Sequence, residues 1–229
     1  MTPIEEAPTV SNEKSRNALL QSIYHHYLDD EDAANFVRAV SQRYMVSTLE
    51  RLATNGARNT RRAAVMAIGF LGNYESNGVV GKALVDSDRG VRMLAENSIR
   101  ELWCRDGSDT QRQTLQVILR MNAARQFDEA VQLATSLIDE APWFAEAWNQ
   151  RAIAHFHSER FEESANDCHQ SLELNPYHFG AACGMAYSYL EMSDAMAALE
   201  CFHRALTLNP SMEGVRAQAQ FVQRSLEES

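Results

Sequence analysis

A 34-residue period marked by prolines constrains the fold of this chain more than any other feature. Pro142, Pro176 and Pro210 lie 34 residues apart, and each ends a run of helix-forming residues, within DEAP, ELNP and TLNP. Proline cannot continue a helix, because it lacks an N–H group and its ring clashes with the preceding turn. Each proline therefore predicts a turn between one structural unit and the next.

Other positions fall into register with the same period. Segments such as FDEAVQLATSLI place apolar residues at helical spacing. Small or apolar residues share columns, as expected where two helices approach closely: Phe127, Phe161 and Ala195; Ala130, Ser164 and Ala198; Leu137, Ser171 and Ala205. The period predicts three helical hairpins, at residues 111–144, 145–178 and 179–212, followed by a capping helix at 213–228 that closes the stack.

These units resemble the tetratricopeptide repeat (TPR) family. Beyond the prolines, the resemblance rests on Trp148, Tyr189, Ala130, Ala198, Phe202 and Ala205. The chain departs from the family pattern at Thr114 and Ala182, where an early aromatic residue is usual, and at Ile118, Ala152 and Ala186, where glycine is usual. The resemblance implies a TPR domain over residues 108–229, in which the first helix of each unit lines a concave face.

The first half of the chain shows a shorter repeat. Arg61, Ala64, Ile68 and Leu71 recur 31 residues later as Arg92, Ala95, Ile99 and Leu102. This resembles HEAT-like repeats and predicts a helical repeat region over 13–107, after a mobile N-terminus at 1–12. The predicted fold class is all-α, a right-handed α-solenoid of stacked antiparallel helix pairs, with the boundary near residues 104–111.

Charge and cysteine content limit the function classes. The net charge is −10, of which residues 108–229 carry −9, so the TPR region is a poor candidate for binding nucleic acid. No apolar run approaches 18 residues, and the N-terminus lacks the pattern of a signal peptide. The four cysteines have no paired close spacing, which favours a cytoplasmic protein with reduced thiols. Because no apolar run is long enough to span a bilayer, we expect no membrane partner.

Motifs that carry chemistry are absent from the sequence. It contains no phosphate-binding loop, nucleophile elbow or paired metal-ligand cysteines, so we expect no catalytic residue, metal or cofactor. His155 and Cys168 in the middle unit share columns with packing residues, which favours a core role over metal binding. A basic group, Arg58, Arg61, Arg62, Arg89 and Arg92, suits an acidic partner, but we prefer an internal role in which Arg61 and Arg92 satisfy carbonyls and neighbours such as Asp86 and Asn55.

The exposed positions of the first TPR helices predict a mixed apolar and polar groove. Its residues are Leu115, Leu119, Asn149, Gln150, Ile153, Phe156, Tyr187 and Leu190. One known use of this face in the family is a clamp of Lys, Asn and Arg on a chaperone's C-terminal carboxylate. The matching positions carry no basic residue: Leu115, Leu119, Gln150, Gly180 and Gly184. The groove therefore predicts an amphipathic helix or an apolar peptide as ligand, with Asn149 and Gln150 as hydrogen-bonding groups.

The resulting functional hypothesis is a non-catalytic scaffold or adaptor that binds another protein. Alternatives are a regulatory subunit of a separate enzyme, and a HEAT-type lyase-like enzyme, for which only the fold analogy speaks. A further alternative is a groove covered by the adjacent repeat, by residues 1–12 or by a second copy of the protein in a homo-oligomer.

Overall fold

The computed structural model describes residues 10–228, which contain thirteen α-helices, one short 3₁₀ turn and no strand. The helices form stacked hairpins, so the prediction of an all-α fold of antiparallel helix pairs is confirmed. The chain divides into two compact units, Met1–Ile99 and Arg100–Ser229. Within residues 10–228 no helix combines the length and the apolar character needed to cross a bilayer.

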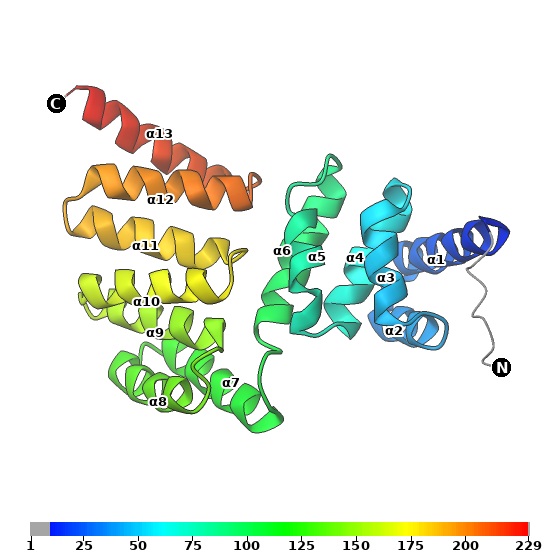
Figure 1. Cartoon of the computed structure of the whole chain (residues 1–229), viewed down its shortest axis with the longest axis horizontal. Helices are drawn as coiled ribbons and strands as arrows, with labels where there is room; N and C mark the ends of the chain where they lie inside the picture. Colours follow the sequence, from blue (N-terminus) through cyan, green and yellow to red (C-terminus); the bar gives the residue numbers. More distant parts are fainter. Residues whose placement is uncertain (1–9, 229) are drawn as a thin grey trace, which may run out of the picture. The chain divides into compact units, whose positions relative to one another are not determined.

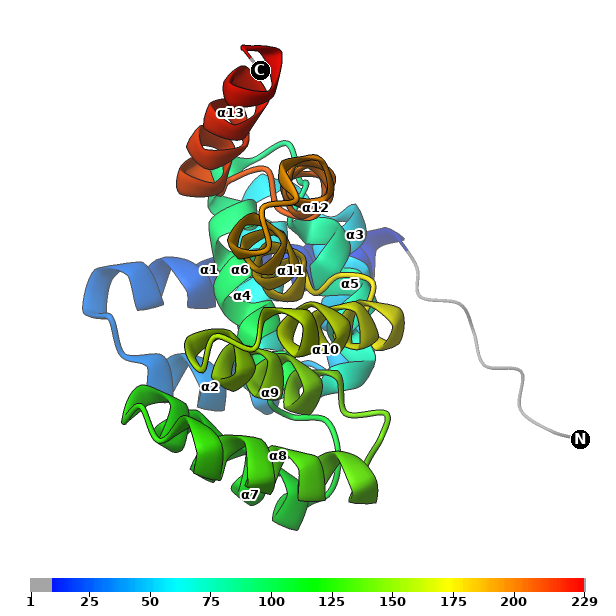
Figure 2. The same ribbon diagram turned by 90° about the vertical axis from the view of Figure 1, so that its left-hand side faces the viewer.

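The second unit is a regular stack of helices. Its hairpins are α7 (Asp109–Ala123) with α8 (Phe127–Glu140), α9 (Ala145–His157) with α10 (Phe161–Leu174), and α11 (Phe179–Glu191) with α12 (Ala195–Leu208), followed by α13 (Glu213–Glu227). Figure 1 and Figure 2 both show α7–α13 side by side in chain order. The second helix of each hairpin ends two residues before the proline of that unit, as the proline period predicts.

The turn inside each hairpin repeats at the same period. Arg125, Glu159 and Ser193 have φ values of 60°, 60° and 62°, in the left-handed region. The residue after each donates its N–H five residues back, with Gln126 N to Met121 O at 2.9 Å as the first example. This pattern of a left-handed residue and a long backward hydrogen bond closes the last turn of a helix and satisfies its carbonyls.

Small residues allow the helices of this unit to approach closely. Ala130, Ser164 and Ala198, which share one column of the period, are almost completely buried. At Gly184 in α11 a methyl group would lie 2.8 Å from the sulfur of Cys168 in α10, so a side chain there would require a shift. The columns that the sequence predicts as packing positions therefore form the interior of the stack.

The first unit contains helices of less regular length. They are α1 (Val10–Asp30), α2 (Ala33–Ser41), α3 (Val46–Asn55), α4 (Arg58–Leu71), a 3₁₀ turn (Tyr74–Ser76), α5 (Asn77–Ala83) and α6 (Arg89–Trp103), whose last turn belongs to the second unit. Ala64 and Ile68 in α4 and their 31-residue equivalents Ala95 and Ile99 in α6 are fully buried. The HEAT-like assignment stays a prediction, and residues 1–9 of the predicted mobile N-terminus lie outside the described part.

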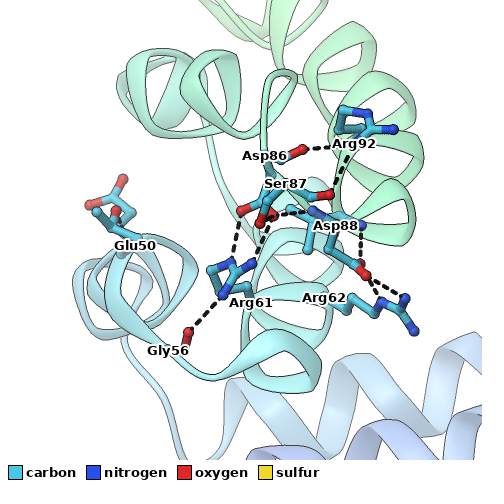
Figure 3. Close-up of polar contacts among 10 residues, drawn as sticks. Glu50, Gly56, Arg61, Arg62, Asp86, Ser87, Asp88 and Arg92 are labelled. Atoms are coloured by element: carbon cyan, nitrogen blue, oxygen red, sulfur yellow. Dashed lines mark hydrogen bonds and ion pairs between the residues drawn. The ribbon is translucent and has the colours of Figure 1, made fainter. Parts of the chain in front are cut away.

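Two arginines of α4 hold the turn that precedes α6 (Figure 3). The Arg61 guanidinium donates two hydrogen bonds of 2.7 Å to the carboxylate of Asp86. Arg62 makes the corresponding pair with Asp88 at 2.6 and 2.8 Å. Paired guanidinium–carboxylate contacts of this kind fix both distance and orientation, so they set the position of the turn against α4.

Backbone carbonyls near the same turn accept hydrogen bonds from Arg61 and from Arg92 of α6. Arg61 Nη1 donates to the carbonyl of Gly56 at 3.1 Å, so the predicted neighbour Asn55 is replaced by the backbone of the next residue. Arg92 Nη1 donates to the carbonyls of Asp86 and Ser87 at 2.8 and 3.2 Å. These contacts support the internal role that the sequence favours for Arg61 and Arg92.

Candidate functional site

A cavity of about 400 Å³ opens on the second unit. It lies along the first helices of the last two hairpins, α9 and α11, and the last turn of α6 contributes to its wall. Six of the eight predicted groove residues line it together: Leu119, Asn149, Gln150, Ile153, Phe156 and Tyr187. These residues come from three different helices, so the stacking of the hairpins brings them together.

The other two predicted residues lie elsewhere. Leu115 is fully buried and belongs to a core cluster with Ile118 and Phe144, so its side chain supports the hairpin instead of facing a ligand. Leu190 is partly buried against the core near the end of the chain and is not among the residues that line the cavity. The helical register alone does not distinguish an inward-facing leucine from one at the rim.

A buried carboxylate forms part of the cavity wall. Glu146 lies in the first turn of α9 and is 6% exposed. Its Oε2 lies 2.8 Å from Nε2 of His178, the residue that precedes α11. Its Oε1 accepts hydrogen bonds from Gln150 Nε2 at 2.7 Å and from Asn149 Nδ2 at 3.1 Å. The two amides predicted to bind a partner thus donate their N–H groups to Glu146.

These contacts extend into a polar chain across the first helices of the three hairpins. Asn122 in α7 donates to both the backbone carbonyl and the side-chain oxygen of Gln150 at 2.9 Å. Gln150 donates in turn to Glu146, which is joined to His178. Buried polar groups that satisfy one another in this way fix the relative position of the helices that carry them.

The ionisation of Glu146 follows from its surroundings. Burial by itself would raise the pKa of this carboxyl group, but the hydrogen bond and electrostatic effect of His178, followed by the hydrogen bonds from Gln150 and Asn149, hold the pKa below its usual value. The position of Glu146 at the N-terminal end of α9, where the helix dipole favours negative charge, acts in the same direction. The cavity wall therefore contains a negative charge at neutral pH.

The last turn of α6 adds an aromatic wall that the sequence analysis missed. The Trp103 ring stacks on the imidazole of His178, with centroids 4.0 Å apart and an interplanar angle of 16°. The Arg100 guanidinium lies 4.7 Å from the centroid of the Phe179 ring. Arg100 and Trp103 precede the first predicted repeat, residues 111–144, and the sequence places them in the HEAT-like region. A sequence signal that could have found Trp103 is its position next to the predicted boundary near residues 104–111.

The four cysteine thiols lie in surroundings that disfavour the thiolate. Burial raises the pKa of Cys104 to about 12 and that of Cys183 and Cys201 to about 11, and it raises that of Cys168 as well. These thiols therefore stay protonated and weakly nucleophilic at neutral pH. No group of three or more His, Cys, Asp or Glu side chains suited to a metal ion occurs among the described residues.

Comparisons with known proteins show what the repeats are similar to. A family model described as tetratricopeptide repeat matches residues 145–178, which contain α9 and α10. A TPR repeat-containing protein of Rhizobium etli is 27% identical over 130 residues, 57% of this chain and 64% of that protein. The chain thus spans less than two thirds of that relative's length.

Solved structures agree on the fold. The first TPR of Spaghetti (RPAP3), bound to the HSP90 peptide SRMEEVD, superposes with a TM-score of 0.51 at 19% identity, over 53% of this chain and 96% of that chain. The Sgt2 TPR domain from Aspergillus fumigatus gives 0.50 at 18% identity, over 53% and 82%. The resemblance to the TPR family predicted from the 34-residue period is confirmed.

Proposed function

We propose that this chain, whose C-terminal unit consists of tetratricopeptide repeats, is a non-catalytic scaffold or adaptor that holds a segment of another protein. The observation that carries the proposal is the gathering of six predicted groove residues around one cavity of about 400 Å³. Cavities that bind ligands combine mostly apolar walls with a few placed polar groups, and this one has that composition.

The side chains of the cavity wall favour a peptide or amphipathic helix as the ligand. Ile153, Phe156 and Tyr187 supply apolar and aromatic surface, and Tyr187 is 38% exposed. Such surface binds the apolar anchors that a helix presents at intervals of three and four residues. The amides of Asn149 and Gln150 support the wall of the cavity through Glu146.

The related TPR structure that holds an HSP90 peptide supports a peptide as the class of ligand. It does not support the HSP90 peptide itself as the ligand of this chain. The bound peptide SRMEEVD is acidic near its end. In the present chain the positions that match a carboxylate clamp carry no basic side chain, and the cavity wall contains the carboxylate of Glu146. We therefore propose a partner other than an acidic chaperone tail.

The four free cysteines support a reducing, cytoplasmic setting.

Affinity capture with groove variants tests the proposal. We expect the tagged chain to capture a stable partner, and we expect Phe156→Asp and Tyr187→Asp to lose it, because a charge in the apolar wall opposes docking. Phe221→Asp is the matched control, since Phe221 is 60% exposed on α13 and does not line the cavity. Circular dichroism checks that each variant is folded. Unchanged capture by both folded groove variants would refute the proposal.

A further inference from the structure

The protonation pattern around Glu146 leaves a buried negative charge without a cationic partner among its hydrogen-bonded neighbours. The backbone N–H of Ala181 donates to Nδ1 of His178 at 3.0 Å, so this nitrogen carries a lone pair. The ring proton is then on Nε2, which donates to Glu146 Oε2 at 2.8 Å. In this tautomer the imidazole is neutral. Asn149 and Gln150, the other donors, are neutral amides.

The acceptor capacity of Glu146 is incompletely used. A carboxylate offers about four lone-pair positions. Among the described residues, Gln150 and Asn149 occupy two on Oε1, and His178 occupies one on Oε2. Burying a charge without a countercharge is costly, so an arriving cation would gain more here than at an exposed carboxylate.

The other charged residues on the cavity wall have contacts of their own. Glu101 adds a second carboxylate, 3.6 Å from Arg105, and Arg100 adds one guanidinium, which lies over the Phe179 ring. His157 also lines the cavity, with its ring stacked on Phe127 at 4.9 Å. Because Glu101 is paired with Arg105, Glu146 is the buried carboxylate that remains for a ligand on this wall.

Aromatic rings line the same cavity. Trp103, Phe156 and Tyr187 come from three separate helices and contribute to its wall. The face of an aromatic ring attracts a cation, and the attraction increases when water is excluded. Aromatic walls next to a carboxylate are the surroundings that suit an ammonium or guanidinium group on an apolar stem.

We propose that this cavity receives a lysine or arginine side chain of the partner peptide, with the cationic group at Glu146 Oε2 and its stem against the aromatic rings. The inference rests on the proposed function, since it specifies the charge of the ligand in the same groove. The net charge of −9 on residues 108–229 attracts such a peptide before contact. The same charge opposes an acidic ligand, so the cavity selects by repulsion as well as by attraction.

Selection from a phage-displayed library of random dodecapeptides, with the full chain as bait, tests the sign of the charge. We expect enriched peptides to share one lysine or arginine flanked by apolar residues, and to lose binding to Phe156→Asp. Enriched peptides that need Phe156 but have a neutral or acidic residue at that position would overturn the inference and leave the proposed function intact. Failure to enrich any peptide would count against both.

Fluorescence anisotropy with one selected peptide then locates the contact. Replacing its basic residue by glutamine should weaken binding to the wild-type chain by about 10- to 100-fold, as expected for a lost charged hydrogen bond. Glu146→Gln should weaken the original peptide to a similar extent and the glutamine analogue much less. Equal binding of the two peptides to the wild-type chain would overturn the inference, whatever the stability of the variant.

Sedimentation velocity of the free chain tests the alternative that a second copy of the chain occupies the groove. If the cavity is filled by a second copy, the chain will sediment as a dimer and Phe156→Asp will make it monomeric. We expect Phe156→Asp to leave the sedimentation coefficient of the free chain unchanged. Conversion from dimer to monomer would overturn the assignment of a basic peptide.

Discussion

His178 is a polar residue in a column of the 34-residue period that holds apolar residues in the other two units, Phe144 and Met212. Glu146 lies in a column with Arg112, Gly180 and Gly214. Both are buried, and each is the hydrogen-bond partner of the other across 32 residues of sequence. A buried ionised group is tolerated when it is hydrogen-bonded, so the two residues depend on each other.

A double-mutant cycle on this pair tests that dependence. His178→Phe restores the apolar type of the column but removes a donor from the buried carboxylate, and should lower the free energy of unfolding by about 2–4 kcal/mol. Glu146→Gln removes the charge, so the double variant should be less destabilised than the sum of the two, with a coupling of about 1–3 kcal/mol. Urea unfolding followed by circular dichroism measures each value. Additive effects would show that the residues act independently.

At the residue scale, the sequence predicts which helix face a side chain occupies better than it predicts which residues that side chain contacts. Helical register groups Leu119, Ile153 and Phe156, which line one cavity, because spacing along a helix determines which residues share a face. The same register also selects Leu115, which the packing of α7 against its neighbours buries. The Glu146–His178 pair depends on how two hairpins stack, which no local pattern contains.

At the scale of elements, the turn before α6 is held by charged pairs. Asp88 accepts two hydrogen bonds from Arg62 and one from the N–H of Val91 at 3.0 Å. The hydrogen bonds from Arg62 hold the pKa of Asp88 at about 2, below its usual value of 3.8. Ionised Asp88 therefore stabilises the folded first unit.

This pKa shift predicts an acid-sensitive step in unfolding. The folded pKa of Asp88 is about 2 and lies below an unfolded value of about 3.9, so its stabilising contribution is complete above pH 4 or so and is lost as the pH falls toward about 2. Asp88→Asn should flatten the dependence of the unfolding free energy on pH in this range. Glu75→Gln, at an exposed carboxylate, should leave it steep. Equal curves for Asp88→Asn and the wild-type chain would contradict the assignment.

The last helix, α13, closes the stack by burying one face. Ala219 and Val222 are each 4% exposed and join the core cluster of the preceding hairpin, whereas the adjacent Phe221 is 60% exposed. The apolar stripe of this segment predicts a capping helix of this kind, because the open end of a repeat array requires a cover.

Neighbouring substitutions in α13 test which face is buried. Val222→Asp should lower the free energy of unfolding by about 2–4 kcal/mol, because it places a charge in the core. Phe221→Asp should change it by less than about 0.5 kcal/mol, as expected for an exposed position. Both values come from urea titrations of the full chain. Similar losses for the two variants would mean that α13 does not cover the stack through this face.

At the scale of the whole molecule, the 34-residue period accounts for the second unit and for its concave cavity. The proline spacing predicts where each hairpin ends, and the small columns predict which positions become interior. It does not predict the contribution of Trp103, because this residue lies before the first repeat and reaches the cavity through the last turn of α6. The part of the cavity wall that comes from α6 lies outside the repeats, so the repeat period carries no information about it.

Site-specific photocross-linking tests the central claim, that the cavity of the second unit is the place where a partner binds. The photoreactive residue p-benzoylphenylalanine replaces Tyr187, at the cavity, or Phe221, on α13; both are exposed aromatic residues. We predict a cross-linked partner peptide from position 187, none from position 221, and loss of the adduct when Phe156→Asp is added. Equal adducts from both positions, or none from position 187 while a partner is still captured, would contradict the account.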